Sequence, residues 1–155
     1  EKVLEMVAGQ VPLLIEIKDQ DGAMGPQVGP LEAATCAALK DYAGDVALMS
    51  FNPHAVAVCA ELAPDIPRGL VTSSYETAFW PEVSADTRDI LREIPDYARV
   101  GACFISHEST DLDRRRVAEL KAKGAKLLAW TIRSAKAEAE ARRIVDNVTF
   151  EGYLA

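Results

Sequence analysis

Hydrophobic and polar positions alternate along the chain in two patterns. Short apolar runs are separated by longer stretches in which apolar residues recur every three or four positions. The runs predict strands and the stretches predict amphipathic helices, an order typical of repeated βα units with a parallel sheet. The predicted strands cover residues 11–18, 46–51, 68–72, 100–106, 126–132 and 147–150. The predicted helices cover residues 30–42, 53–62, 85–94, 111–123 and 134–145.

Two stretches between these elements lack either pattern. Residues 19–29 are rich in Gly, Asp, Gln and Pro, and we expect them to form a long loop over the C-terminal end of the sheet. Residues 73–84 carry Tyr75, Phe79 and Trp80, which we expect to fold over this rim or to pack against a neighbour. Since no linker or low-complexity tract divides the sequence, we predict a single domain over residues 1–155.

Composition narrows the function classes. The 155 residues include 49% hydrophobic and 26% charged residues, a mix that is ordinary for a globular domain. The net charge of −7 argues against a nucleic-acid partner, and no apolar run reaches membrane-spanning length. The odd number of cysteines (Cys36, Cys59 and Cys103), all in apolar periodic segments, predicts reduced core thiols. We therefore expect a cytoplasmic protein.

The first predicted strand carries the most informative chemistry. Glu16 and Lys18 are two residues apart near its C-terminal end, so they share one face of the strand. Charges in so apolar a run must lie at a wet or liganded strand end, which is where α/β proteins place their active sites. Two interpretations remain open at this point, an ion pair at a strand end and a functional site.

Other candidates also lie near strand ends. His107 follows the strand 100–106 beside Glu108 and is a candidate for substrate contact, although such loops also carry many polar residues without a function. His54 is best interpreted as a solvent-facing histidine at a helix start. Trp130 is either a core aromatic or a ligand contact, and Phe51 ends its strand as pocket lining or core.

Four motifs in order resemble a known family. They are Leu14-Ile15-Glu16-Ile17-Lys18, Met49-Ser50-Phe51, the segment Gly-Ala-Lys-Leu-Leu-Ala-Trp-Thr-Ile at 124–132, and Asp-Asn-Val-Thr-Phe-Glu-Gly at 146–152. Together they resemble the glycerophosphodiester phosphodiesterases, whose fold is a TIM barrel, over nearly the whole chain. The resemblance implies an α/β fold, here a partial barrel with about six parallel strands alternating with helices.

The resemblance also implies an activity and roles for residues. Family members hydrolyse glycerophosphodiesters, in glycerophospholipid metabolism, to glycerol 3-phosphate and an alcohol. Two histidines move protons, a divalent ion neutralises the phosphate, and the neighbouring glycerol hydroxyl attacks phosphorus. Carried over, Glu16 is a ligand for Mg²⁺ or Ca²⁺ and Lys18 contacts the phosphate. Trp130 walls the glycerol pocket, with Phe51 and His107 as further substrate-binding candidates.

The chain also departs from the family pattern. The family places a His-Arg pair, a Glu-x-Asp pair and a further histidine upstream of the Glu-x-Lys strand, and this sequence contains none of them. We therefore interpret the chain as the third to eighth strands of a barrel that needs about 250 residues when complete. We expect it to hold no catalytic residue and to be inactive alone. Its unpaired strand edges predict self-association or pairing with the missing N-terminal portion.

Two other functions are compatible with parts of the sequence. The chain is either derived from an enzyme of this family or a non-catalytic barrel fragment that keeps an anion-binding site at Lys18. A barrel aldolase with Lys18 as its Schiff-base lysine is disfavoured, because that chemistry needs a desolvated lysine and Glu16 stands beside this one.

Overall fold

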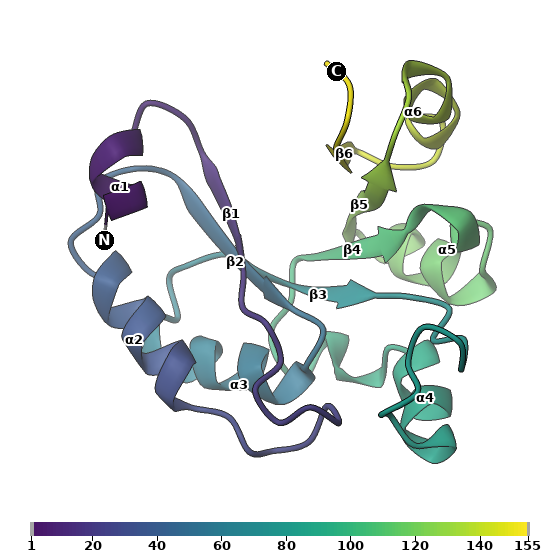
Figure 1. Cartoon of the computed structure of the whole chain (residues 1–155), viewed down its shortest axis with the longest axis horizontal. Helices are drawn as coiled ribbons and strands as arrows, with labels where there is room; N and C mark the ends of the chain where they lie inside the picture. Colours follow the sequence, from purple (N-terminus) through teal and green to yellow (C-terminus); the bar gives the residue numbers. More distant parts are fainter. Residues whose placement is uncertain (1, 155) are drawn as a thin grey trace. The chain divides into compact units, whose positions relative to one another are not determined.

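The computed structural model describes residues 2–154, in which strands alternate with helices along the chain (Figure 1). The strands are β1 (Leu13–Glu16), β2 (Val46–Ser50), β3 (Arg68–Thr72), β4 (Phe104–Glu108), β5 (Lys126–Ile132) and β6 (Asn147–Phe150). The helices are α1 (Lys2–Val7), α2 (Pro30–Leu39), α3 (Pro53–Leu62), α4 (Ala85–Arg92), α5 (Arg115–Ala122) and α6 (Ala135–Ala141). Within the sheet the strands follow their order in the sequence.

The chain forms two compact units. The first holds the residues up to Leu70 together with Asp96–Ala102, and the second holds Val71–Pro95 together with the chain from Cys103 onward.

The first unit is built on β1 and β2. These strands pair in parallel from Leu13 opposite Val46 to Glu16 opposite Met49, and β2 continues the ladder with the start of β3. Helices α2 and α3 pack together beside them. The core is formed by Ile17, Cys36, Leu39, Leu48 and Cys59, all of which are buried.

The second unit is built on β4, β5 and β6. The pairing of β4 with β5 is parallel from Phe104 opposite Lys126 to Glu108 opposite Trp130, and β5 pairs in parallel with β6 after a register shift between Ala129 and Ile132. Its buried apolar side chains come from the strands and from α5, and include Ile105, Val117, Leu120, Leu127 and Ile132.

Local residue chemistry explains where several helices begin. Prolines occupy the first positions of α2 and α3, where a missing N–H costs no hydrogen bond. Ser84 and Ser134 cap α4 and α6, with their hydroxyls accepting the N–H of Thr87 at 3.1 Å and of Ala137 at 3.2 Å. The predicted helix starts at Pro30 and Pro53 are thus confirmed.

Several predicted boundaries are wrong. The strand expected at 11–18 is β1 at Leu13–Glu16, and the helices expected at 30–42, 85–94 and 134–145 end earlier, at Leu39, Arg92 and Ala141. Two further elements start later than predicted. The strand expected at 100–106 is β4 at Phe104–Glu108, because Gly101 (φ +60°) and the bond from Ala102 N–H to the Tyr97 carbonyl fold the preceding residues into a turn. His107 therefore lies inside the strand. The helix expected from 111 begins at Arg115, after a short 3₁₀ turn at Ser109–Asp111.

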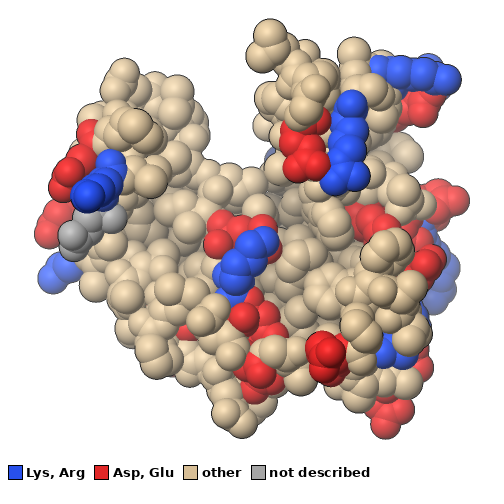
Figure 2. Space-filling view, in the orientation of Figure 1, with Lys and Arg blue, Asp and Glu red and all other residues tan. Residues whose placement is uncertain are grey.

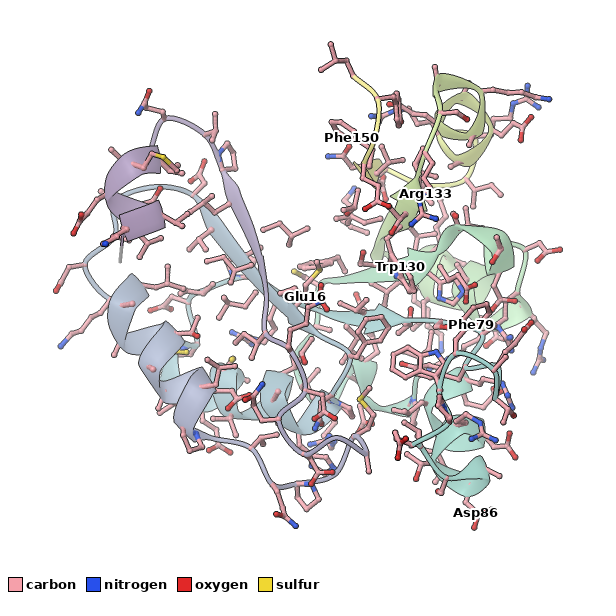
Figure 3. The ribbon with its side chains drawn as sticks, viewed as in Figure 1. Glu16, Phe79, Asp86, Trp130, Arg133 and Phe150 are labelled. Atoms are coloured by element: carbon pink, nitrogen blue, oxygen red, sulfur yellow. The ribbon has the colours of Figure 1, made fainter. Side chains whose placement is uncertain are left out.

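One prediction about buried side chains is wrong. Cys36 and Cys59 are buried as expected, but Cys103 is exposed immediately before β4. Of the aromatic residues in segment 73–84, Tyr75 is buried and stacks against Trp80 at 5.1 Å between ring centroids. Phe79, labelled in Figure 3, is 74% exposed, so this ring does not pack into the core of its unit.

Among the residues that the structure describes, none of the helices combines the length and the apolar character that a membrane crossing requires.

Candidate functional site

Glu16 and Lys18 lie at the C-terminal end of β1, where Figure 3 labels Glu16. Ile17, between them, is buried in the core of the first unit, so the two charged side chains belong to the opposite face of the strand. The Lys18 ammonium donates to Glu16 Oε1 at 2.8 Å, with the two side chains 74% and 24% exposed. Because so exposed an ion pair adds little stability, the pair alone gives no structural reason for two charges at this strand end.

Asn52 connects the end of β2 to the loop that follows Lys18. Its side chain is fully buried, and its Nδ2 donates to Asp19 Oδ1 and to the Gly25 carbonyl, both at 2.8 Å. Its Oδ1 accepts the His54 N–H at 2.8 Å, which caps α3. One amide thus fixes both the loop and the start of a helix beside the Glu16–Lys18 strand end.

Two carboxylates hold the loop from inside. Asp19 accepts the N–H groups of Asp21, Gly22 and Met24, and Asp21 accepts those of Ala23, Gly25 and Gln27, at 2.8–3.2 Å. These bonds, chiefly the one from Gly25, lower the pKa of Asp21. Both carboxylates accept hydrogen bonds from backbone N–H groups of the loop, and these bonds hold the loop in one conformation.

The remaining candidates of the first unit are less engaged in polar contacts. Ser50 is buried, and its Oγ accepts the Asn52 N–H at 3.1 Å. Phe51, which follows β2, and His54, in the first turn of α3, are both half-buried.

In the second unit, Glu108 ends β4 and is the most strongly perturbed carboxylate. Its Oε2 accepts the hydroxyls of Ser73 at 2.8 Å and Ser74 at 2.9 Å and the Ser74 N–H at 3.0 Å, while Oε1 accepts the Thr110 hydroxyl at 2.7 Å. Burial acts to raise the pKa of Glu108, but these four hydrogen bonds outweigh it and lower the pKa to about 2.

His107 lies beside Glu108 in the strand and is 1% exposed. Its Nδ1 is 2.7 Å from the Thr72 hydroxyl, and its Nε2 is 3.2 Å from Asp111 Oδ2, which also pairs with Arg114 at 2.5 Å. Burial lowers the pKa of His107 and outweighs the opposing effect of Asp111. A neutral ring that accepts from Thr72 and donates to Asp111 satisfies both nitrogens.

Trp130 lies in β5, opposite Glu108 in the ladder, and is labelled in Figure 3. It is half-buried, and its indole N–H donates to the Ser106 carbonyl at 3.0 Å. This bond fixes the edge of the ring and leaves recognition of a ligand to its apolar faces.

The structure places Glu16, Lys18 and Phe51 in the first unit, and His107 and Trp130 in the second. It also reveals residues that the sequence did not single out, namely Asp19, Asn52, Ser73 and Ser74, all near strand ends. Their partners are about 30 residues away in the sequence, as for Asn52 and Asp19 with a separation of 33, so no local pattern could have identified them. In Figure 2, acidic and basic side chains are interspersed on the face that is drawn.

A divalent metal implied by the resemblance would need several hard oxygen or nitrogen donors in one place. Within residues 2–154, no group of three or more His, Cys, Asp or Glu side chains is arranged to hold a metal ion. Glu16 is a single carboxylate paired with Lys18, and Asp19 and Asp21 are engaged with backbone N–H groups. The described residues alone therefore do not fit a complete metal site.

Comparison with known proteins identifies the family. The model of the glycerophosphoryl diester phosphodiesterase family matches residues 1–149. The chain belongs to this family. No protein of curated function matches it.

Solved structures agree with the family assignment. A phosphodiesterase of Oleispira antarctica, in complex with the product sn-glycerol-3-phosphate, is 25% identical with a TM-score of 0.57, over 77% of this chain and 46% of that one. A candidate glycerophosphoryl diester phosphodiesterase of Silicibacter pomeroyi is 20% identical with a TM-score of 0.71, over 96% of this chain and 51% of that one. A glycerophosphodiester phosphodiesterase of Agrobacterium tumefaciens is 17% identical with a TM-score of 0.60, over 96% of this chain and 56% of that one.

These likenesses confirm the predicted fold class, a partial TIM barrel of parallel strands alternating with helices. The chain spans about half the length of the solved glycerophosphodiester phosphodiesterases that it matches.

Proposed function

We propose that the protein to which this chain belongs hydrolyses glycerophosphodiesters to glycerol 3-phosphate and an alcohol, as a step of glycerophospholipid metabolism. The observation that carries the proposal is the family match over residues 1–149. The Oleispira antarctica phosphodiesterase, described with the product sn-glycerol-3-phosphate, supports the substrate class. The position of Glu16 and Lys18 at the C-terminal end of β1 agrees with it, because active sites of barrels lie at that end of the strands.

In this proposal the ammonium of Lys18, which is largely exposed, contacts the phosphate as a point charge. Glu16 would supply one oxygen ligand to Mg²⁺ or Ca²⁺, and residues outside this chain would have to supply the others. When bound, such a metal would neutralise charge on the phosphate oxygens.

Trp130, in the second unit, would form a wall of the pocket for the glycerol moiety, and Phe51, in the first unit, is proposed separately as a pocket-lining residue. Trp130 keeps its N–H on the Ser106 carbonyl, so its contribution is an apolar wall. Contact of His107 with substrate would require the loss of its bond to Thr72 or to Asp111. We therefore propose that His107 acts mainly by ordering the ends of β3 and β4.

We further propose that this chain alone is inactive. Hydrolysis of a diester needs a general acid for the leaving alcohol, and the family's histidine motifs do not occur in this sequence. Both ring nitrogens of His107 are engaged. We also propose a cytoplasmic location, with which three cysteines that form no disulfide are compatible.

The test is hydrolysis of glycerophosphocholine by the intact protein, purified from its source, with Mg²⁺ or Ca²⁺. We expect glycerol 3-phosphate to be released, EDTA to abolish the release and the metal to restore it. Glu16→Gln should lower the rate and the metal affinity by about 100-fold, as loss of a charged ligand does. The matched control is Glu5→Gln, which changes an exposed carboxylate on α1.

Two outcomes would contradict the proposal. Wild-type activity and metal affinity in Glu16→Gln would remove Glu16 from the metal site. Binding of glycerol 3-phosphate that depends on Lys18, without any turnover by the intact protein, would support an anion-binding module instead.

A further inference from the structure

Helices α2 and α3 of the first unit bring two cysteines together. Cys36 is 7% exposed and Cys59 is 2% exposed, and both belong to the same core cluster, with Ile17, Leu39 and Leu48 around them. The two thiols lie within hydrogen-bonding reach of each other, and the helices that carry them pack together. They are therefore a thiol pair across a helix interface.

Cys36 is also accessible to small molecules from one side. It lines a cavity of about 820 Å³ together with Leu39, Tyr42, Leu62 and Ile66, among other residues. This cavity also reaches Val46 at the start of β2, whereas Glu16 lies opposite Met49 further along that strand. The thiol pair is therefore separate from the strand end at which Glu16 and Lys18 lie.

We propose that Cys36 and Cys59 are an oxidation site, at which a small peroxide entering from this cavity converts the two thiols to a disulfide that joins α2 to α3. The peroxide first transfers one oxygen to Cys36 as a sulfenic acid, and one water leaves. The Cys59 sulfur then attacks the Cys36 sulfur, the S–O bond breaks, and the oxygen leaves as a second water with the Cys59 proton. Two thiols are oxidised and one peroxide is reduced.

The surroundings make this reaction slow at neutral pH. Burial raises the pKa of Cys36, and the nearby Glu32 carboxylate raises it further. Burial, Cys36 and Glu32 together raise the pKa of Cys59 to about 12, against a smaller lowering effect of Arg68 from β3. Because the thiolate is the reactive form, the rate of disulfide formation should rise about tenfold per pH unit between pH 7 and 9. The exposed thiol of Cys103 should react faster than the pair.

The test exposes the folded chain carrying Cys103→Ser to hydrogen peroxide and follows its intact mass. We expect a loss of two hydrogens, and digestion without reductant should yield a cross-linked peptide pair that contains Cys36 and Cys59. Cys36→Ser and Cys59→Ala, each made in the same background, should not lose this mass. Two independent variants keep the test decisive if one of them folds poorly.

The parent chain serves as the positive control, since oxidation of Cys103 shows that the peroxide is active. An unchanged mass of the Cys103→Ser chain at pH 9, after an exposure at least a hundred times longer than the one that fully oxidises Cys103 in the parent, would overturn the proposal. A gain of oxygen on Cys36 without a cross-link would overturn it too, because it would show that Cys59 cannot reach the oxidised sulfur.

Discussion

The carboxylate of Glu108 accepts four hydrogen bonds at the end of β4. Hydrogen bonds to a charged group are stronger than neutral ones, but Glu108 is only half-buried, so solvent screens part of their effect. We predict that Glu108→Gln lowers the free energy of unfolding by about 2 kcal/mol at pH 7, measured by urea denaturation. Glu140→Gln, on the exposed face of α6, should change it by less than about 0.5 kcal/mol. Equal stability of the two variants would show that the donors around Glu108 are satisfied equally well without its charge.

Because of His107, we predict that the free energy of unfolding depends on pH. Its pKa is lowered in the folded state, so above the unfolded value of 6.5 the ring is neutral in both states and the contribution is complete. As the pH falls below 6.5, the unfolded chain takes up the proton first, and stability falls by at most about 1.4 kcal/mol per pH unit. Urea denaturation at pH 7.5 and 5.5 measures this loss. His107→Gln should remove most of the difference between the two pH values, whereas His54→Gln should retain it; the opposite result would assign the titration to His54.

The loop after β1 shows how an element without regular structure is kept in one conformation. Asp19 accepts three backbone N–H groups and the Asn52 amide, and we predict that Asp19→Ala destabilises the chain by about 2 kcal/mol. Hydrogen exchange should accelerate at the amides of Gly22 and Met24, which lose their acceptor. Asp41→Ala, an exposed carboxylate after α2, provides the control. Unchanged protection of these amides in Asp19→Ala would mean that Asp21 and Asn52 hold the loop without it.

The elements differ in how far the sequence alone could predict them. Strands β3, β5 and β6 have the predicted boundaries, because short runs rich in apolar and β-branched residues set them locally. Strand β4 starts later than predicted because of the turn at Gly101. The apolar residues before Gly101 are typical of a strand, so the sequence pattern did not predict this turn. Thr72, Ser73 and Ser74, which contact His107 and Glu108, lie 34 or 35 residues earlier at the end of β3, so only the fold reveals them as partners. The Glu16–Lys18 pair was predictable because strand alternation fixes it within three residues.

At the scale of the whole molecule, strand edges suggest association between copies. Within the described residues, β1 pairs only with β2 in the first unit, and β6 pairs only with β5 in the second. Leu14 on β1 is 40% exposed and Phe150 on β6 is 45% exposed. Because exposed edges with apolar side chains favour pairing with another strand, we predict that the chain self-associates. Light scattering at increasing concentration measures this, and a monodisperse monomer throughout would contradict it.

The central claim is that this chain is part of a glycerophosphodiester phosphodiesterase whose proton-transfer groups lie outside it. The most direct test is hydrolysis of glycerophosphocholine, with Mg²⁺ or Ca²⁺, by material whose intact mass matches these 155 residues. We expect this chain to release no glycerol 3-phosphate, while the intact protein releases it under the same conditions. Turnover by the chain itself would contradict the account and would assign the acid and base roles to His54 or His107.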